Sequence, residues 1–296
     1  MTVVAERLRV GLVGAGPWAR AVHAPGLAAH PGVELVSVWG RRHDVAAGLA
    51  AEHGAAAVRE VDELLEQVDA VAFAVPPGVQ APIAVTAARR GRHLVLEKPV
   101  AESVAGAREL VDAVDEAGVA ALVMLTRRFA PETREQLVDW RDLGGWTGGA
   151  ARWVGGGLLG GPYSASPWRH ERGALDDVGP HAFDLLDAAL GRITGVRAAS
   201  CAGGLWQVLL EHESGAVSSA ALGMSVPVSP GVAELEVFGA HGRRVLAGRG
   251  STARDCYAVL LDDLVGAVAS GAVRHPCDVR RGLHLQRVIA EVRALA

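Results

Sequence analysis

The first part of the chain alternates apolar runs of strand length with longer segments of helical periodicity. The apolar runs, which predict buried strands, are Leu8–Val13, Val33–Trp39, Val68–Val75, His93–Leu96 and Val119–Leu125. The segments with helical spacing are Pro17–Ala29, Asp44–Glu52, Val79–Arg90 and Ser103–Glu116. Buried strands separated by helices form parallel sheets through right-handed crossovers. The pattern predicts a doubly wound Rossmann-like domain over residues 1–126.

The pattern changes in residues 127–296, where strands and helices are grouped in separate blocks. The predicted helices are Pro131–Trp140, Leu175–Leu190, Arg254–Ala269 and Val279–Leu295. The predicted strands are Gly204–His212, Gly215–Val226, Val232–Gly239 and Arg243–Ala247, the last completing a hairpin at His241-Gly242. Such grouping predicts an α+β domain built on an open, largely antiparallel sheet, and we expect it to bind substrate. The exposed face of that sheet suggests a homo-oligomer.

Composition narrows the class of protein. With 296 residues, 50% apolar and 21% charged, the chain is long and apolar enough for two folded domains. A net charge of −4 without a basic run excludes nucleic acid and membrane surfaces as expected partners. Three widely spaced cysteines without a CxxC pair argue against a metal site or a disulfide framework. The apolar runs are too short to cross a membrane, so we expect a cytoplasmic protein with a small-molecule substrate.

A glycine-rich turn follows the first predicted strand and precedes a helix. It reads Gly14-Ala15-Gly16-Pro17-Trp18-Ala19. The first glycine of such a turn allows a tight bend, the second lets the backbone approach a diphosphate, and a third small residue allows close packing. Pro17 suits the first position of a helix, whose N-terminus attracts phosphate. The context favours a dinucleotide site over an ordinary tight turn.

Two arginines stand where NAD-binding domains place an acid. After the second predicted strand, the chain reads Gly40-Arg41-Arg42 and has no carboxylate there. A carboxylate at this point binds the ribose 2′-hydroxyl of NAD, whereas guanidinium groups bind the 2′-phosphate of NADP. We therefore expect NADP, with NAD still possible and two solvated arginines as the alternative.

Lys98 is the only lysine among the 29 basic residues and lies in Glu97-Lys98-Pro99, at the carboxyl end of a predicted strand. Ligands of open α/β sheets bind at those ends. Arginine cannot release a proton at working pH, so a site that needs a titratable cation retains lysine. This position indicates a site that needs a titratable or compact cation beside the cofactor crevice, with a lysine that persists by chance as the alternative.

Asp177, His181 and Asp184 have the spacing of one helical face near the start of a predicted helix. A carboxylate beside an imidazole suits proton transfer. Taken alone, the spacing favours a helix-capping aspartate with an incidental histidine, and only its combination with the other motifs favours proton transfer.

The ordered set of these motifs resembles the Gfo/Idh/MocA oxidoreductases, the family of glucose–fructose oxidoreductase and inositol dehydrogenase. The motifs that carry the resemblance are the glycine turn, His23-Ala24-Pro25, Val75-Pro76-Pro77, Gly91–Pro99, Arg128-Phe129, Trp168-Arg169, Gly173–Leu175 and Asp177–His181. The resemblance implies NAD(P)-dependent hydride transfer on a sugar-, polyol- or cyclic-ketone-like substrate. It also implies catalytic roles for Lys98, Asp177 and His181, and places Trp168-Arg169 at the substrate pocket.

The residues expected at the cofactor are Gly14, Gly16, Pro17, Trp18, Ala19, Gly40, Arg41, Arg42, Val75, Pro76, Pro77, Glu97, Lys98 and Arg169. Two positions depart from the family pattern: Gln80 stands where a histidine is frequent, and Glu171-Arg172-Gly173 replaces a glycine run. One alternative is a non-catalytic NAD(P)- or sugar-sensing regulator of the same fold. Another is redox-assisted elimination or hydrolysis with a tightly held cofactor.

Overall fold

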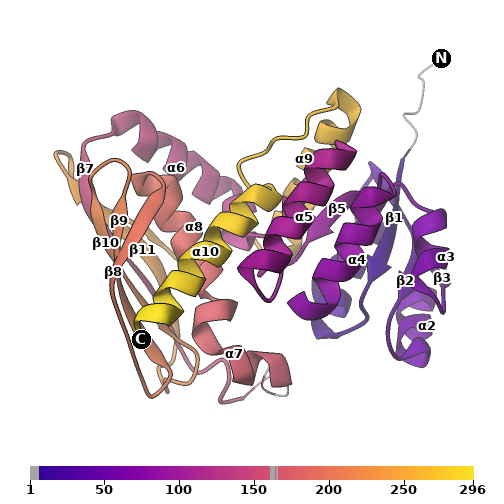
Figure 1. Ribbon diagram of the computed structural model, residues 1–296, viewed down its shortest axis with the longest axis horizontal. Helices are drawn as coiled ribbons and strands as arrows, with labels where there is room; N and C mark the ends of the chain where they lie inside the picture. The colour runs from indigo at the N-terminus through magenta and orange to yellow at the C-terminus, as the bar shows by residue number, and fades with distance from the viewer. Residues whose placement is uncertain (1–6, 161–163, 165) are drawn as a thin grey trace. The chain divides into compact units, whose positions relative to one another are not determined.

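The computed structural model describes residues 7–160, 164 and 166–296 (Figure 1). Backbone proximity divides the chain into two compact units. The first comprises Met1–Phe129 and Thr252–Leu283, and the second comprises Ala130–Ser251 and His284–Ala296. The expected division at residue 126 assigned everything after it to one domain, whereas the stretch 252–283 groups with the first unit.

The first unit holds a parallel sheet and its helices. Its elements are β1 (Leu8–Val13), the π-helical turn η1 (Ala19–His23), α1 (Ala24–Ala29), β2 (Val33–Trp39), α2 (His43–Glu52), β3 (Ala56–Ala57), α3 (Val61–Glu66), β4 (Ala70–Phe73), α4 (Pro77–Arg89), β5 (His93–Leu96), α5 (Val104–Ala117), β6 (Ala121–Val123), the 3-10 helix η2 (Thr126–Phe129) and α9 (Ala253–Ser270).

The strands lie in the order β3-β2-β1-β4-β5-β6 and are all parallel, which confirms the predicted Rossmann domain. Strands β1, β2 and β5 have the predicted bounds. The order reverses between β1 and β4, and this switch point is where such sheets bind ligands. The sequence pattern gave no signal for β3 and α3, which are very short.

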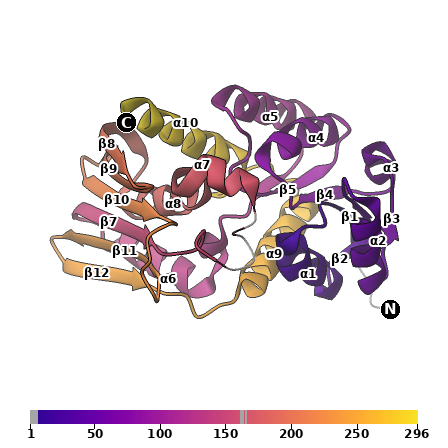
Figure 2. The same ribbon diagram turned by 90° about the horizontal axis from the view of Figure 1, so that it is seen from below.

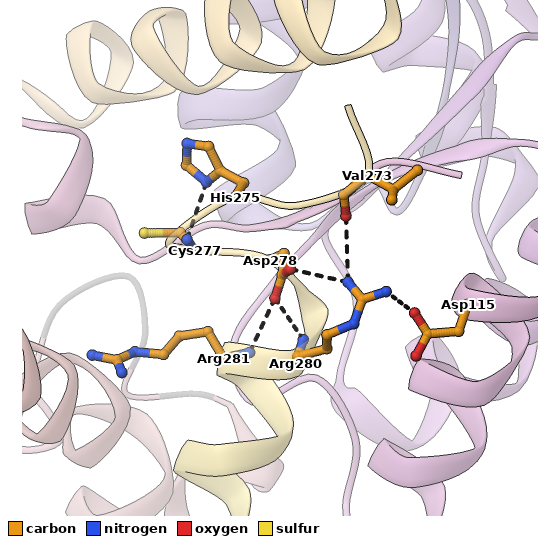
Figure 3. A network of polar contacts seen from close by, with 7 residues as sticks. All are labelled: Asp115, Val273, His275, Cys277, Asp278, Arg280 and Arg281. Carbon is orange, nitrogen blue, oxygen red and sulfur yellow. Dashed lines mark hydrogen bonds and ion pairs between the residues drawn. The ribbon is translucent and has the colours of Figure 1, made fainter. Parts of the chain in front are cut away.

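The late stretch of the first unit is fixed by helix packing and by a half-buried arginine, Arg280. Helix α9 packs on α1, η1 and β6. The N–H of Val123 donates to the carbonyl of Cys277 at 2.8 Å. Figure 3 shows Arg280 between Asp115 of α5 and Asp278, with 3.0 Å to the latter. Burial lowers the pKa of Arg280, so the two carboxylates are needed to offset its desolvation.

The second unit holds the other sheet. Its elements are α6 (Pro131–Leu143), β7 (Trp146–Val154), α7 (Pro167–Asp177), α8 (Gly179–Leu190), β8 (Ile193–Ala202), β9 (Leu205–His212), β10 (Val217–Gly223), β11 (Val232–Gly239), β12 (Gly242–Ala247) and most of α10 (Val279–Leu295). The strands run in the order β12-β11-β7-β10-β9-β8, which Figure 2 shows side by side.

Among the described strand pairs of this second sheet, only β7–β10 is parallel, so the prediction of a largely antiparallel sheet is confirmed. The predicted hairpin joins β11 to β12. Helix α8 packs on β7, β10 and β11. Strand β7 was not predicted, because glycines interrupt its apolar pattern, and two of these glycines are needed for packing. A Cβ at Gly148 would lie 2.7 Å from the Phe238 ring, and one at Gly149 would lie 3.1 Å from Leu190.

Within the described part of the chain, no helix combines the length and the apolar content needed to cross a membrane.

Candidate active site

The glycine turn after β1 leaves room for a diphosphate. Gly14 has a φ of +125°, and a Cβ there would lie 2.4 Å from the carbonyl oxygen of Ala74. Only glycine fits this close approach of two strand ends. A Cβ at Gly16 would meet no atom within 4 Å. Pro17 then begins the first helix, whose N-terminal N–H groups suit an anion. The residues present therefore fit a dinucleotide.

The end of β2 places two guanidinium groups beside this turn. A Cβ at Gly40 would lie 3.5 Å from the Cβ of Ala15, so the two loops are neighbours. Arg41 and Arg42 are both exposed, and among the described residues neither has an ion-pair partner. Two uncompensated guanidinium groups suit a phosphate ester.

The carboxylate of Glu97, at the end of β5, is held from the first helix. The indole N–H of Trp18 donates to Oε1 of Glu97 at 2.7 Å, and Nε2 of His23 lies 2.9 Å from the same oxygen. A carboxylate only accepts hydrogen bonds, so Nε2 of His23 carries a proton. His23 lies in the π-helical turn η1, a distortion that is frequent at functional sites.

Tyr257 of α9 packs against the imidazole ring of His23. Its ring centroid lies 4.6 Å from that of His23, and the side chain is fully buried. Burial, together with the nearby charge of Glu97, raises the pKa of Tyr257 well above its ordinary value. A Cβ at Gly26 would lie 2.5 Å from the tyrosine ring, so α1 needs glycine where α9 crosses it.

Gln80, in the first turns of α4, binds the backbone around Lys98. Its Oε1 accepts from the N–H of Glu97 at 2.8 Å, and its Nε2 donates to the carbonyl of Glu97 at 2.8 Å. Nε2 also lies within 3.3 Å of the carbonyl oxygens of Pro99 and Val100. Lys98 itself is partly exposed at the end of β5.

In the second unit, Asp177 and His181 stand on either side of a helix break. Helix α7 ends at Asp177 and α8 begins at Gly179. The expectation of one continuous helical face was therefore wrong. Pro180 has no N–H to donate to the carbonyl of Asp176, so the helix ends and restarts there. Asp177 and His181 are both buried.

Each of these two side chains has a defined neighbour. Nε of Arg169 donates to Oδ2 of Asp177 at 2.9 Å. The imidazole of His181 stacks on the indole of Trp153 from β7, with centroids 5.4 Å apart and an angle of 25°. Arg169 thus orients the aspartate, while its expected contact with the cofactor stays a prediction. No set of three metal-ligating side chains is found among the described residues.

The comparisons with known proteins agree with this architecture. Residues 8–125 match the model of an oxidoreductase family with an NAD-binding Rossmann fold. The dTDP-3,4-didehydro-2,6-dideoxy-alpha-D-glucose 3-reductase of Streptomyces violaceoruber is 30% identical over 270 residues, which cover 86% of this chain and 74% of that protein. The chain belongs to the Gfo/Idh/MocA oxidoreductase family.

Other known proteins match part of the chain or share its fold. A 4-carboxy-2-hydroxymuconate-6-semialdehyde dehydrogenase of Sphingobium sp. is 35% identical over 42% of this chain, which is 40% of the relative's length. The GenD2 structure from gentamicin A biosynthesis, in complex with NAD, has a TM-score of 0.84 at 24% identity and covers 99% of this chain and 95% of its own. The 3-ketoreductase KijD10 from Actinomadura kijaniata, in complex with TDP-benzene and NADP, has a TM-score of 0.80 at 23% identity over 98% of each chain.

The sequence motifs identified some residues of the candidate site, and the structure adds others. The glycine turn, Trp18 and Glu97 were expected, and all lie in the first unit. His23 entered only as part of the resemblance, and Gln80 only as a departure from it. Trp153 and Tyr257 gave no sequence signal, because each acts through contact with a residue far along the chain.

Proposed function

We propose that this family member transfers a hydride between a nicotinamide cofactor and a ring carbon of a sugar-like substrate, interconverting a carbonyl and an alcohol. The observation that carries the proposal is the turn at Gly14–Gly16, which leaves open space at a Rossmann switch point, one strand from Lys98. The similarity to a dTDP-sugar 3-reductase supports the substrate class.

The chemistry requires a proton as well as a hydride. A bound nicotinamide dinucleotide supplies or accepts the hydride. When a carbonyl is reduced, its oxygen gains negative charge and then takes up one proton to become a hydroxyl. We assign this proton transfer to His181, because imidazole titrates near neutral pH.

Lys98 polarises the substrate oxygen through its positive charge and anchors the substrate. Asp177, held by Arg169, orients the imidazole or binds a neighbouring substrate hydroxyl. The roles of Lys98 and His181 can be exchanged, since both groups can donate a proton.

The cofactor in this proposal is NADP. It is supported by the exposed guanidinium groups of Arg41 and Arg42 and by the absence of an acid at the end of β2. Among solved relatives, one structure holds NAD and another NADP, so the family likeness leaves the choice to these residues.

The test has two measurements on the purified protein. Fluorescence titration should give at least tenfold tighter binding of NADPH than of NADH, and Arg41→Ala with Arg42→Ala should weaken NADPH selectively. Oxidation of NADPH should then be followed with dTDP- and UDP-linked keto sugars, inososes and simple cyclic ketones. Tighter NADH binding would overturn the NADP assignment, and no turnover across the panel would overturn the sugar reductase.

The other readings have less support. A non-catalytic sensor is not favoured, because the named relatives are dehydrogenases and reductases. Redox-assisted elimination or hydrolysis would require cofactor that stays bound through gel filtration, which that measurement decides.

The proposal includes a homo-oligomer formed through the second sheet, in the cytoplasm. Leu209, Val217 and Phe238 are exposed large apolar side chains. The strand register places them on one face, because Val217 and Phe238 both pair with Gly148, and Leu209 pairs with Ser219. A second copy of the chain would cover this face, which light scattering can check. Free cysteines at 201, 256 and 277 suit a reducing compartment.

A further inference from the structure

The backbone N–H and carbonyl of residue 97 have no neighbouring strand on the β4 side. The N–H of Leu94 donates to the carbonyl of Ala120, and the carbonyl of Leu96 accepts from the N–H of Met124, so even-numbered residues of β5 face β6. Odd-numbered residues face β4, as the bond from the N–H of His93 to Asp69 shows. The β4–β5 pairing ends at Ala72 and Val95. Residue 97 therefore faces a place where β4 has already ended.

The side-chain amide of Gln80 fills that place. It exchanges two hydrogen bonds of 2.8 Å with the N–H and carbonyl of Glu97, as a neighbouring strand residue would. The side chain is fully buried. Backbone N–H and carbonyl groups without a partner destabilise a fold, so the local backbone requires this amide.

The same amide also determines the path of the chain after Lys98. Its nitrogen lies 3.3 Å from the carbonyl of Pro99 and 3.2 Å from that of Val100. The chain on both sides of Lys98 is thus bonded to one side-chain amide. The carboxylate of Glu97 is held independently by Trp18 and His23, so residue 97 is fixed through its backbone and its side chain.

We propose that Gln80 is a positioning residue for Lys98: by taking the place of the missing strand neighbour, its amide sets the direction in which the lysine leaves β5. This inference rests on the proposed function for its catalytic consequence, and on the backbone geometry alone for its structural part. A misplacement of about 1 Å at a reacting group can cost about 10²-fold in rate. Gln80→Met should therefore lower kcat about 10- to 100-fold and change the Kd for NADPH by less than about threefold.

The single lysine gives a readout that needs neither cofactor nor substrate. Reductive ¹³C-methylation labels Lys98 and the terminal amine, and Lys98→Met identifies the lysine signal by its loss. In Gln80→Met, we expect the Lys98 methyl signals to move toward their positions in the urea-unfolded protein. Gln80→His, which keeps one donor and one acceptor, should recover part of the shift and part of kcat.

The matched control is Gln286→Met, which changes another buried glutamine, on α10 in the second unit. It should leave the Lys98 signals and the Kd for NADPH unchanged. Lys98 signals that coincide in Gln80→Met and the wild type would overturn the positioning role. If the signals move but Lys98→Met turns over at the wild-type rate, the positioning role stands and the proposed catalytic role of Lys98 fails. Should Gln80→Met not fold, Gln80→His alone must still displace the signals.

Discussion

Lys98 and His181, the two side chains assigned to the substrate oxygen, are oriented in different ways. On both sides of Lys98, the amide of Gln80 from α4 bonds the backbone, while His23 of η1 holds the carboxylate of the preceding residue, Glu97. His181 follows a helix break and has its ring face on Trp153. A lysine chain with many rotatable bonds needs a fixed starting point, whereas an imidazole needs a defined ring plane. Substitution of Gln80 should therefore act on Lys98 through the backbone, and substitution of Trp153 should act on His181 through the plane of its ring.

The largest effect on kcat is expected when Lys98 or His181 is itself replaced. Lys98→Met and His181→Ala each remove a group that we propose to hold or move charge at the substrate oxygen, so each should lower kcat by about 10²–10⁴. NADPH binding, measured by fluorescence, should change only a few-fold. Lys98→Arg retains the positive charge without a titratable proton, and its kcat separates polarisation from proton donation. Wild-type turnover in both of the first two variants would exclude the catalytic assignment.

A smaller effect is expected at Trp153. Trp153→Leu removes the aromatic face that fixes the plane of His181, and we expect kcat to fall by about tenfold, which corresponds to roughly 1.4 kcal/mol. Trp153→Phe should recover most of the loss because a ring face remains. The measurement is steady-state turnover with the substrate found in the panel. Equal rates for the leucine and phenylalanine variants would show that the stacking is incidental.

The smallest effect is on the stability of the folded protein in acid, and it arises in the second unit. In the second unit, Glu132 accepts hydrogen bonds from the N–H groups of Gly250 and Ser251, both at 2.9 Å, and from the Ser251 hydroxyl at 2.7 Å. These bonds hold the pKa of Glu132 at about 2. A folded-state pKa below the unfolded value stabilises the protein above about pH 4.3, and this stabilisation is lost as the pH falls toward 2.

Glu132→Gln should abolish that pH dependence. Because the carboxylate is close to solvent, we expect its contribution to be at most about 1 kcal/mol. Urea unfolding at pH 5 and pH 3 measures it, with Glu109→Gln at the exposed Arg89 pair as the control. A loss of stability between the two pH values that is the same in the wild type and Glu132→Gln would contradict the assignment.

Elements with strong periodicity were predictable from the sequence, and those defined by distant partners were not. Strands β1, β2 and β5 and helix α10 have the expected bounds, because their side chains alone specify which face is buried. Strand β7 was not predicted, because its glycines make room for Phe238 and Leu190, which lie far along the chain. Strand β8 was missed because most of its residues are small or exposed.

The same distinction applies to the candidate site. Gly14, Gly16 and Glu97 could be selected because their motifs have local spacing. The role of Gln80 depends on where β4 ends relative to β5, which is a property of the sheet rather than of the residues around it.

The return of the chain at α9 has a consequence for biosynthesis. The first unit needs Tyr257 against His23, and Arg280 beside Asp115, so its early residues lack these partners until the chain beyond residue 251 has been made. While the ribosome is still adding the second unit, β6 lacks its neighbour at Cys277 and the pocket behind His23 is empty of its tyrosine. The nucleotide-binding unit therefore reaches its final form only after residues 252–283 have been synthesised, and a nascent fragment that ends at residue 126 should bind chaperones in preference to dinucleotide.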